Sequence, residues 1–320
     1  MKKYLIIGAA AFLMFSFSGT SAATVLPATS QARDAEADVK YETYKFNCRN
    51  FNGLDLSHNV KARLVKSNSY KVEVTLPAEL KEYLEVKVEG GELSIGMNDR
   101  FNSSKVNRKY RNKSWTCTAE IAMPELRELE MSGATEFECE DTFDLGGKDF
   151  SLDLNGASRL KSLNVNGGEF EAEISGASSY KIGGNFKKAE IELSGAAGGQ
   201  LDLNADAMEL EVSGASKTRF NGTAGTISLD ASGASKVTID GNIGKFYVSA
   251  SGASDVRAIN AECENVYVET SGACKCELNA KKSFTINEAS GASQIKYKTP
   301  KDLGIIVKSI SKAATVKRID

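Results

Sequence analysis

The segment LEVSGAS at residues 210–216 returns nineteen residues later as LDASGAS at residues 229–235. Between residues 131 and 320 this Gly-Ala corner occurs nine times, with successive glycines 19 to 23 residues apart. The glycines are Gly133, Gly156, Gly176, Gly195, Gly214, Gly233, Gly252, Gly272 and Gly291. A fixed period over nine copies is the signature of a solenoid, in which each repeat forms one coil.

Within each repeat, hydrophobicity alternates with period 2. Positions two, four and six before the glycine are mostly apolar, as in Ile227, Leu229 and Ala231, and alternation resumes after it, as in Val237 and Ile239. This pattern indicates strands with one buried face, and no repeat has room for an additional ten-residue helix, which disfavours leucine-rich repeats. We therefore predict an all-β parallel β-helix (β-solenoid) with about 19–20 residues per coil over 131–320 and broader coils over 39–130.

The corner residues have a structural interpretation. Glycine accepts the positive φ of a tight bend, and the alanine beside it leaves space where coils stack at about 4.8 Å. We assign this structural role to Gly176, Gly195, Gly214, Gly233 and Gly252. Serine hydroxyls two residues after the glycine, such as those of Ser216 and Ser235, are expected to form a ladder in which each donates to the next.

The N-terminus carries the pattern of an export signal. Lys2 and Lys3 precede an apolar segment over residues 5–17, and small residues follow up to Ala23. We interpret residues 1–23 as a signal peptide, with a retained N-terminal anchor as the alternative, and residues 24–38 as a linker. The mature chain has no other membrane-spanning stretch. We expect it to be exported to the periplasm or the cell surface.

Charge and composition exclude several classes of function. The chain has 40 Lys+Arg against 42 Asp+Glu, a formal net charge of −2 that disfavours nucleic-acid binding. His58 is its single histidine, so a Ser-His-Asp triad would depend on that residue. The six cysteines have no zinc-like spacing. Buried thiols and disulfides both remain open for them.

A basic insertion over residues 98–114 breaks the alternation. Its cations are interleaved with aromatic residues, a combination that suits anionic polymers or sugars, and a solvated loop is the alternative. The candidate binding residues are Arg100, Arg108, Lys109, Tyr110, Arg111 and Trp115.

Acidic residues recur three positions before each glycine. If the coils stack in register, they form an acidic ladder on one face, with a basic ladder on the adjoining face. The central acidic members are Glu173, Glu192, Glu211 and Asp230. Solvation of these charges, weak Ca²⁺ binding, and self-association of acidic face on basic face are three ways to relieve their repulsion. No other cofactor is expected.

The chain resembles the family called putative auto-transporter adhesin, head GIN domain. The matching features are FNGLDL at 51–56, VKARLV at 60–65, YLEVKV at 83–88 and GGELSI at 90–95, with AMPEL at 122–126 leading into the corner repeats. The resemblance covers roughly residues 42–319. It implies an exported envelope protein with a β-solenoid body and an adhesive role, and it supplies no catalytic residues.

The function favoured by these observations is a non-catalytic, adhesin-like module that binds a cell-surface glycan or protein. A second hypothesis is an envelope scaffold that contacts only itself. The third is a polysaccharide-cleaving enzyme, because parallel β-helices also carry lyases and hydrolases. Such an enzyme would need carboxylates and a Lys or Arg in one groove, whereas here the acids form a uniform column.

Overall fold

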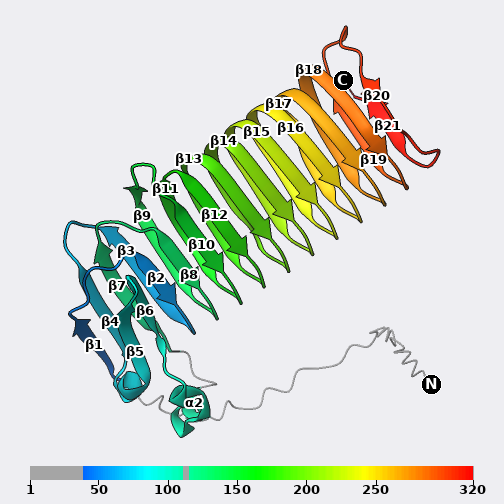
Figure 1. Cartoon of the computed structure of the whole chain (residues 1–320). Helices are drawn as coiled ribbons and strands as arrows, with labels where there is room; N and C mark the ends of the chain where they lie inside the picture. Colours follow the sequence, from blue (N-terminus) through cyan, green and yellow to red (C-terminus); the bar gives the residue numbers. More distant parts are fainter. Residues whose placement is uncertain (1–38, 111–114, 320) are drawn as a thin grey trace, which may run out of the picture. The chain divides into compact units, whose positions relative to one another are not determined.

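The computed structural model describes residues 39–110 and 115–319. The expected signal peptide 1–23, the linker 24–38 and Arg111 therefore lie outside the described residues. Strands dominate at 64%, and a parallel β-solenoid makes about ten turns of roughly 19 residues. Figure 1 shows the coils stacked in one file. The predicted fold class is confirmed.

In the regular part of the solenoid, one long strand runs from each corner to the next. These strands are β13 (Ser179–Leu193), β14 (Gly198–Val212), β15 (Lys217–Ala231), β16 (Lys236–Ala250), β17 (Asp255–Thr270) and β18 (Lys275–Ala289). Neighbouring strands pair in parallel and in register, so that Glu192 lies beside Glu211 and Glu211 beside Asp230. Equivalent positions of successive repeats therefore form columns along the stack.

The coils on either side of this part are built from shorter strands. Before it come β8 (Glu128–Met131), β9 (Glu136–Asp144), β10 (Phe150–Leu154), β11 (Arg159–Asn166) and β12 (Glu169–Ile174). After it come β19 (Gln294–Lys298), β20 (Ile306–Val307) and β21 (Thr315–Arg318). Phenylalanines stack inside the early coils, with ring centroids of Phe150 and Phe170 5.6 Å apart.

The corner glycines have the left-handed conformation that the sequence predicts. At Gly214 φ is 67°, and an added Cβ would lie 2.6 Å from the carbonyl oxygen of Gly195 in the preceding coil. The same carbonyl accepts a hydrogen bond of 2.7 Å from the backbone N–H of Ala215. Glycine is required here both for its φ and for this close approach of backbone to backbone.

His58 takes the corner position in the coil that precedes Gly133. Its φ is 70°, and its carbonyl oxygen accepts a hydrogen bond from the N–H of Ala134, as the glycine carbonyls do in later coils. Its imidazole is half-buried, with Nδ1 3.0 Å from Ser57 Oγ and 3.3 Å from the N–H of Met97. Removal from water lowers the pKa of the imidazole.

The prediction that the serine hydroxyls form a ladder along the stack is wrong. In the described structure the buried hydroxyls of Ser178, Ser216, Ser235 and Ser254 have no hydrogen-bond partner. Equivalent positions of neighbouring coils are about 4.8 Å apart, more than the usual 2.5–3.0 Å between hydrogen-bonded hydroxyl oxygens. At the first corner the side chains do reach one another, because Thr135 Oγ1 donates a hydrogen bond of 3.0 Å to Ser158 Oγ. The four unpaired serine side chains act as small buried groups beneath the corner.

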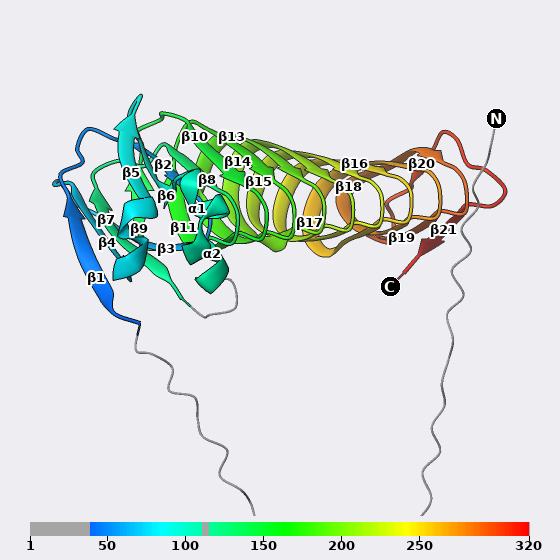
Figure 2. The same cartoon turned by 90° about the horizontal axis from the view of Figure 1, so that it is seen from below.

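The N-terminal region combines coils with antiparallel strands. Strands β2 (Gly53–Leu56) and β3 (Val60–Lys66) form a coil that pairs in parallel with β8 and β9. On its other side, β6 (Glu92–Met97) and β7 (Cys117–Met123) pair with it in parallel. Three antiparallel strands follow, namely β4 (Lys71–Pro77), β1 (Tyr41–Phe46) and β5 (Leu84–Glu89), with the 3₁₀ helix η1 (Ala78–Tyr83). Figure 2 shows them at one end of the stack.

All six cysteines lie in the described ranges and are free thiols, five of them buried. Burial raises the pKa of both Cys117 and Cys263 to about 12. In the described part of the chain, no helix has the length and hydropathy needed to cross a membrane.

Candidate functional site

The basic insertion occupies the place of a corner, because it joins β6 to β7 in the coil next to His58. It contains two short helices, α1 (Arg100–Ser103) and α2 (Lys105–Tyr110). Its aromatic residues are packed together, with the Trp115 ring centroid 5.9 Å from that of Phe101 and 6.1 Å from that of Tyr110. Tyr110 is only 3% exposed. These aromatic side chains anchor the insertion to the solenoid.

The cations of the insertion are spread over its surface. Lys109 Nζ lies 2.8 Å from Glu79 Oε1, and Arg100 donates a hydrogen bond of 3.4 Å to the carbonyl oxygen of Glu82. Arg108 is exposed, and Arg111 lies outside the described residues. The structure thus brings Tyr110 and Trp115 together as a packed cluster, while two of the cations bind acidic or carbonyl groups of η1.

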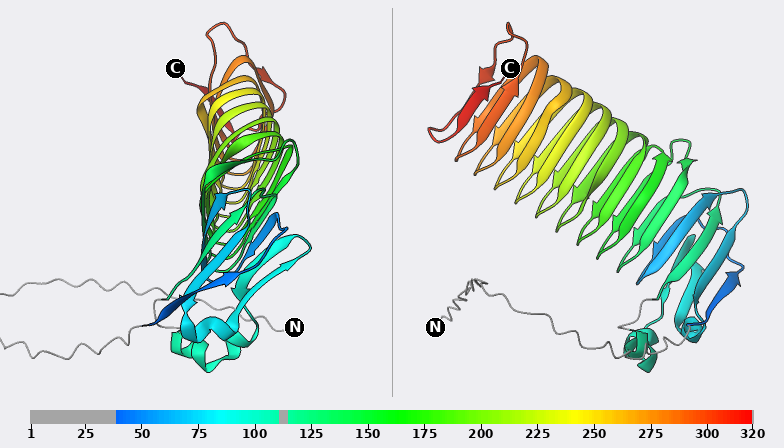
Figure 3. Two further views of the ribbon diagram at one scale, coloured as in Figure 1. Left: turned by 90° about the vertical axis from the view of Figure 1, so that its left-hand side faces the viewer. Right: turned by 180° about the vertical axis from the view of Figure 1, so that it is seen from behind.

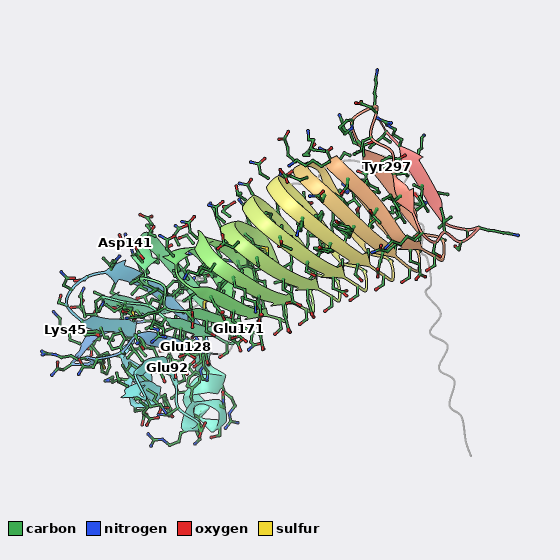
Figure 4. The ribbon with its side chains drawn as sticks, turned by 45° about the horizontal axis from the view of Figure 1, so that its top comes forward. Lys45, Glu92, Glu128, Asp141, Glu171 and Tyr297 are labelled. Atoms are coloured by element: carbon green, nitrogen blue, oxygen red, sulfur yellow. The ribbon has the colours of Figure 1, made fainter. Side chains whose placement is uncertain are left out.

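The acidic residues three positions before each glycine do stack in register. We call them the acidic column, and its members are Asp55, Glu130, Asp153, Glu173, Glu192, Glu211 and Asp230. A second column lies two residues earlier in each strand. Figure 4 shows three of its members, Glu92, Glu128 and Glu171, following one line along the stack.

No member of the acidic column makes an ion pair with any described residue. Near the N-terminal end the crowding is visible in the pKa values. Partial burial, with the negative charges of Asp55, Glu128 and Asp153, raises the pKa of Glu130. Partial burial and the charge of Glu173 raise the pKa of Asp153. The acidic column therefore carries negative charge that no ion pair of the described chain neutralises, although Lys87 opposes the charge of Asp55 and Lys188 pairs with Glu190 of the second column.

The adjoining face, formed by the residues that follow each corner, is mixed in charge. The expectation of a basic ladder there is wrong, because acids stand among the cations in the same or neighbouring columns and pair with them. Arg219 Nε lies 2.9 Å from Asp240 Oδ2, and Lys296 Nζ lies 2.9 Å from Glu277 Oε1. Glu136 contacts both Lys61 and Lys161. This face balances its own charge.

Two hollows lie along the acidic column. One, of about 180 Å³, is lined by Glu173, Glu192, Glu211 and Asp230 among others. The second, of about 270 Å³, shares Glu211 and Asp230 and adds Tyr247 and Tyr267. Sequence reasoning missed these tyrosines. The signal was present, since both stand five residues before a corner glycine, where most repeats have Glu or Ser.

No constellation for metal or nucleophile chemistry stands out among the described residues. Within those ranges, no group of three or more His, Cys, Asp or Glu side chains is arranged to hold a metal ion. The Ser57–His58 contact joins neighbours in the chain at a half-buried corner.

Three solved structures of bacterial proteins match this chain over most of its length. A putative adhesin from Parabacteroides merdae is 16% identical, with 88% of this chain and 98% of that chain covered and a TM-score of 0.50. A putative adhesin from Parabacteroides distasonis is 17% identical, with the same coverage and a TM-score of 0.49. A protein described as a putative lipid binding protein from the same species is 15% identical, with the same coverage and a TM-score of 0.46. At 16% identity and a TM-score of 0.50, the likeness to the first of these structures concerns the fold alone.

The search of curated proteins finds no match. The family model described as “Putative auto-transporter adhesin, head GIN domain” matches residues 50–221 and 197–300. These ranges include β2, β3, the antiparallel cap strands β4 and β5 and nearly all of the corner repeats, and the chain therefore belongs to this family.

Proposed function

We propose that the protein is a non-catalytic, adhesin-like binding module that presents the strand faces of its solenoid to a polymeric partner, a glycan or a protein. The observation that carries this proposal is the acidic column. It runs in register through successive coils, and none of its members makes an ion pair with a described residue. A flat, repetitive face of this kind suits an extended ligand better than a small substrate.

The absence of an assembled catalytic centre in the described residues supports a binding role. The column repeats one carboxylate per coil. A glycoside-cleaving site instead needs two carboxyl groups at a defined separation across a single bond. Family membership and the export pattern of residues 1–23 support action at the periplasm or the cell surface.

A binding screen of the purified, processed protein tests this proposal. The protein is passed over immobilised envelope polysaccharides, host-type glycans and extracellular proteins at low and physiological salt, and the same polymers are assayed for cleavage. We expect salt-sensitive binding without turnover, and we expect E192Q/E211Q to weaken it. The matched control E262Q/E264Q also removes two exposed charges, at a distant bend, and should bind normally. Turnover of any polymer, or no binding to any of them, would overturn the proposal.

A second candidate, an envelope scaffold that contacts copies of itself, is favoured by the last coil. Ile306, Val307 and Ile310 are 58%, 43% and 49% exposed, and within the described chain β20 and β21 each pair on one side only. Open edges with apolar side chains favour pairing with another strand. Sedimentation velocity of the wild type and of I306S/I310S tests this candidate, because only the scaffold predicts an oligomer that the substitutions dissociate.

A further inference from the structure

Tyr247 and Tyr267 interrupt the second column, which lies two residues before the acidic column in each strand. Tyr247 and Tyr267 occupy adjacent coils, with ring centroids 4.8 Å apart and planes only 12° from parallel. Tyr247 is 41% exposed, although a large aromatic side chain on a solvent-facing strand gains little stability from burial there. Burial in the hydrophobic core therefore does not explain why a stacked tyrosine pair stands at this position.

The neighbours of Tyr247 in the second column cover only one face of its ring. Tyr267 covers one side of the ring, and the coil on the other side presents Ser228, whose side chain is small. Glu209 stands one coil beyond Ser228. Two coil spacings, or about 9.6 Å, therefore separate Glu209 from Tyr247 along the stack. The 270 Å³ hollow lies over this gap.

Carboxylates surround the hollow. Glu209, Glu211, Asp230 and Glu269 all line it, and none makes an ion pair with a described residue. Lys188 acts on Glu209 only through a longer-range charge interaction, and Asn287 donates a hydrogen bond of 3.1 Å to Glu269. The exposed Lys245 stands two residues before Tyr247 in the same strand but does not line the hollow. An open aromatic face beside unneutralised carboxylates favours a planar cation, which stacks on the ring and pairs with the acids.

We propose that this hollow binds an arginine side chain of a basic polypeptide segment, whose further cationic side chains lie along the acidic column. This inference rests on the proposed binding function and names its partner. A guanidinium is flat, stacks on tyrosine at about 3.5–4 Å and leaves its N–H groups for Glu209 or Asp230. A neutral sugar could also stack on Tyr247, but it would leave the four carboxylates without a counter-charge.

The neighbouring hollow extends the site to several residues. It shares Glu211 and Asp230 with the tyrosine hollow and continues over Glu192 and Glu173. Alternate side chains of an extended segment are about 6.7 Å apart, and carboxylates in the column about 4.8 Å. Long, flexible cationic side chains accommodate this difference, so exact periodicity is not required of the partner.

Fluorescence anisotropy with labelled nona-arginine and nona-lysine tests the proposal on the processed protein. We expect both peptides to bind at low salt and to weaken as salt rises, with nona-arginine about two- to five-fold tighter because its planar guanidinium stacks on tyrosine, whereas an ammonium makes only the weaker cation–π contact. Y247S/Y267S should abolish this preference and weaken nona-lysine binding less than nona-arginine binding. E211Q/D230N should weaken both peptides by about tenfold.

The matched control E262Q/E264Q removes the same charge from acids that pair with Lys281 and Lys282 at another bend, and it should bind like the wild type. Melting by circular dichroism verifies that each variant folds. An unchanged arginine preference in Y247S/Y267S, or equal weakening by the control, would overturn the site. A neutral hexasaccharide that binds the wild type but not Y247S/Y267S would reassign the hollow to a sugar and leave the binding function standing.

Discussion

The segment before each corner and the segment after it recur in every coil, yet they arrange charge in opposite ways. In β13 to β18 both segments are parts of one long strand. Before the corner, Glu192, Glu211 and Asp230 follow one another without a cation. After it, Arg219 pairs with Asp240 across neighbouring coils. Figure 3 shows the coils following one another in one stack, so both segments recur along its length. Both faces meet the same packing requirements, so the solenoid does not itself require an uncompensated column.

The requirements of folding do not explain the unpaired charges of the acidic column. A stacked column places like charges about 4.8 Å apart and costs up to about 0.9 kcal/mol per pair at the dielectric constant of water. The second face avoids this cost by mixing signs, and the first does not. The first face is therefore the better candidate for contact with a partner that supplies the missing positive charge.

The largest expected effect comes from breaking the corner that holds the two faces in register. In Gly214→Ala, the new Cβ would lie 2.6 Å from the Gly195 carbonyl oxygen at a φ of 67°. We expect a loss of about 2–4 kcal/mol in the free energy of unfolding, from left-handed strain plus displacement of the stacked backbone. The midpoint of urea unfolding measures it.

Gly146→Ala is the matched control. Gly146 has a similar φ of 61°, but nothing lies within 4 Å of its added Cβ. It should lose only the strain contribution of about 1–2 kcal/mol. Equal losses at the two positions would show that coil stacking adds nothing to the glycine requirement.

The corners and the acidic column were predictable because they are local patterns at a fixed period. A Gly-Ala pair every 19 or 20 residues and alternation with period 2 determine which residues align and which face outward. His58 escaped prediction because the corners were recognised by their glycine. Leu56 and Ser57 before it match the residues before Gly195, but histidine stands where the glycine would be. The antiparallel pairing of β4 with β7 escaped because it joins segments far apart in the sequence.

The paired charges of the second face needed the structure for another reason. Arg219 and Asp240 are 21 residues apart, one coil plus two positions, so their contact depends on which rotamers reach diagonally. The tyrosine pair is different, since Tyr247 and Tyr267 occupy the same position of two repeats. A comparison of the residues at this position in every repeat would have identified the two tyrosines from the sequence alone.

Neutralising a carboxylate should lower the free energy of unfolding on the paired face and raise it on the acidic face. On the paired face, Glu136→Gln removes contacts of 3.1 Å to Lys61 and 2.8 Å to Lys161, which lower the pKa of Glu136. A lowered pKa contributes stability above the ordinary value near 4.5 that is lost as the pH falls. We expect Glu136→Gln to lower the free energy of unfolding by about 0.5–1 kcal/mol at pH 7, after allowance for solvent screening.

That loss should fade in melts recorded as the pH falls through the lowered pKa of Glu136, because the wild type then becomes protonated as well. Lys161→Gln serves as a reciprocal control, because it removes one partner of the same pair. A loss that is constant from pH 7 to pH 3 would point to packing rather than to charge.

On the acidic face, Asp153→Asn should stabilise the protein. Burial and Glu173 raise the pKa of Asp153, so the ionised form is disfavoured by folding above its ordinary value of 3.8. The penalty is absent at low pH and fully present once the pH exceeds the raised pKa. We expect a gain of a few tenths of a kcal/mol at pH 7 and none near pH 3, measured as melting temperature against pH. A destabilised variant at pH 7 would show that the column contributes favourable contacts instead.

The smallest expected effect is that of Ca²⁺ on the same column. The ion takes six to eight oxygen ligands, whereas adjacent coils offer one carboxylate each at about 4.8 Å, so we propose only weak, millimolar association with neighbouring pairs such as Glu192 and Glu211. At a concentration equal to the dissociation constant, binding adds about 0.4 kcal/mol. For a domain of this size that corresponds to a rise of about 1 °C in melting temperature. We expect the rise at low ionic strength, its reversal by EDTA, and its loss in E192Q/E211Q but not in E262Q/E264Q. A rise that persists in E192Q/E211Q would place the ion elsewhere, and no rise at 10 mM Ca²⁺ would leave solvation alone to relieve the column.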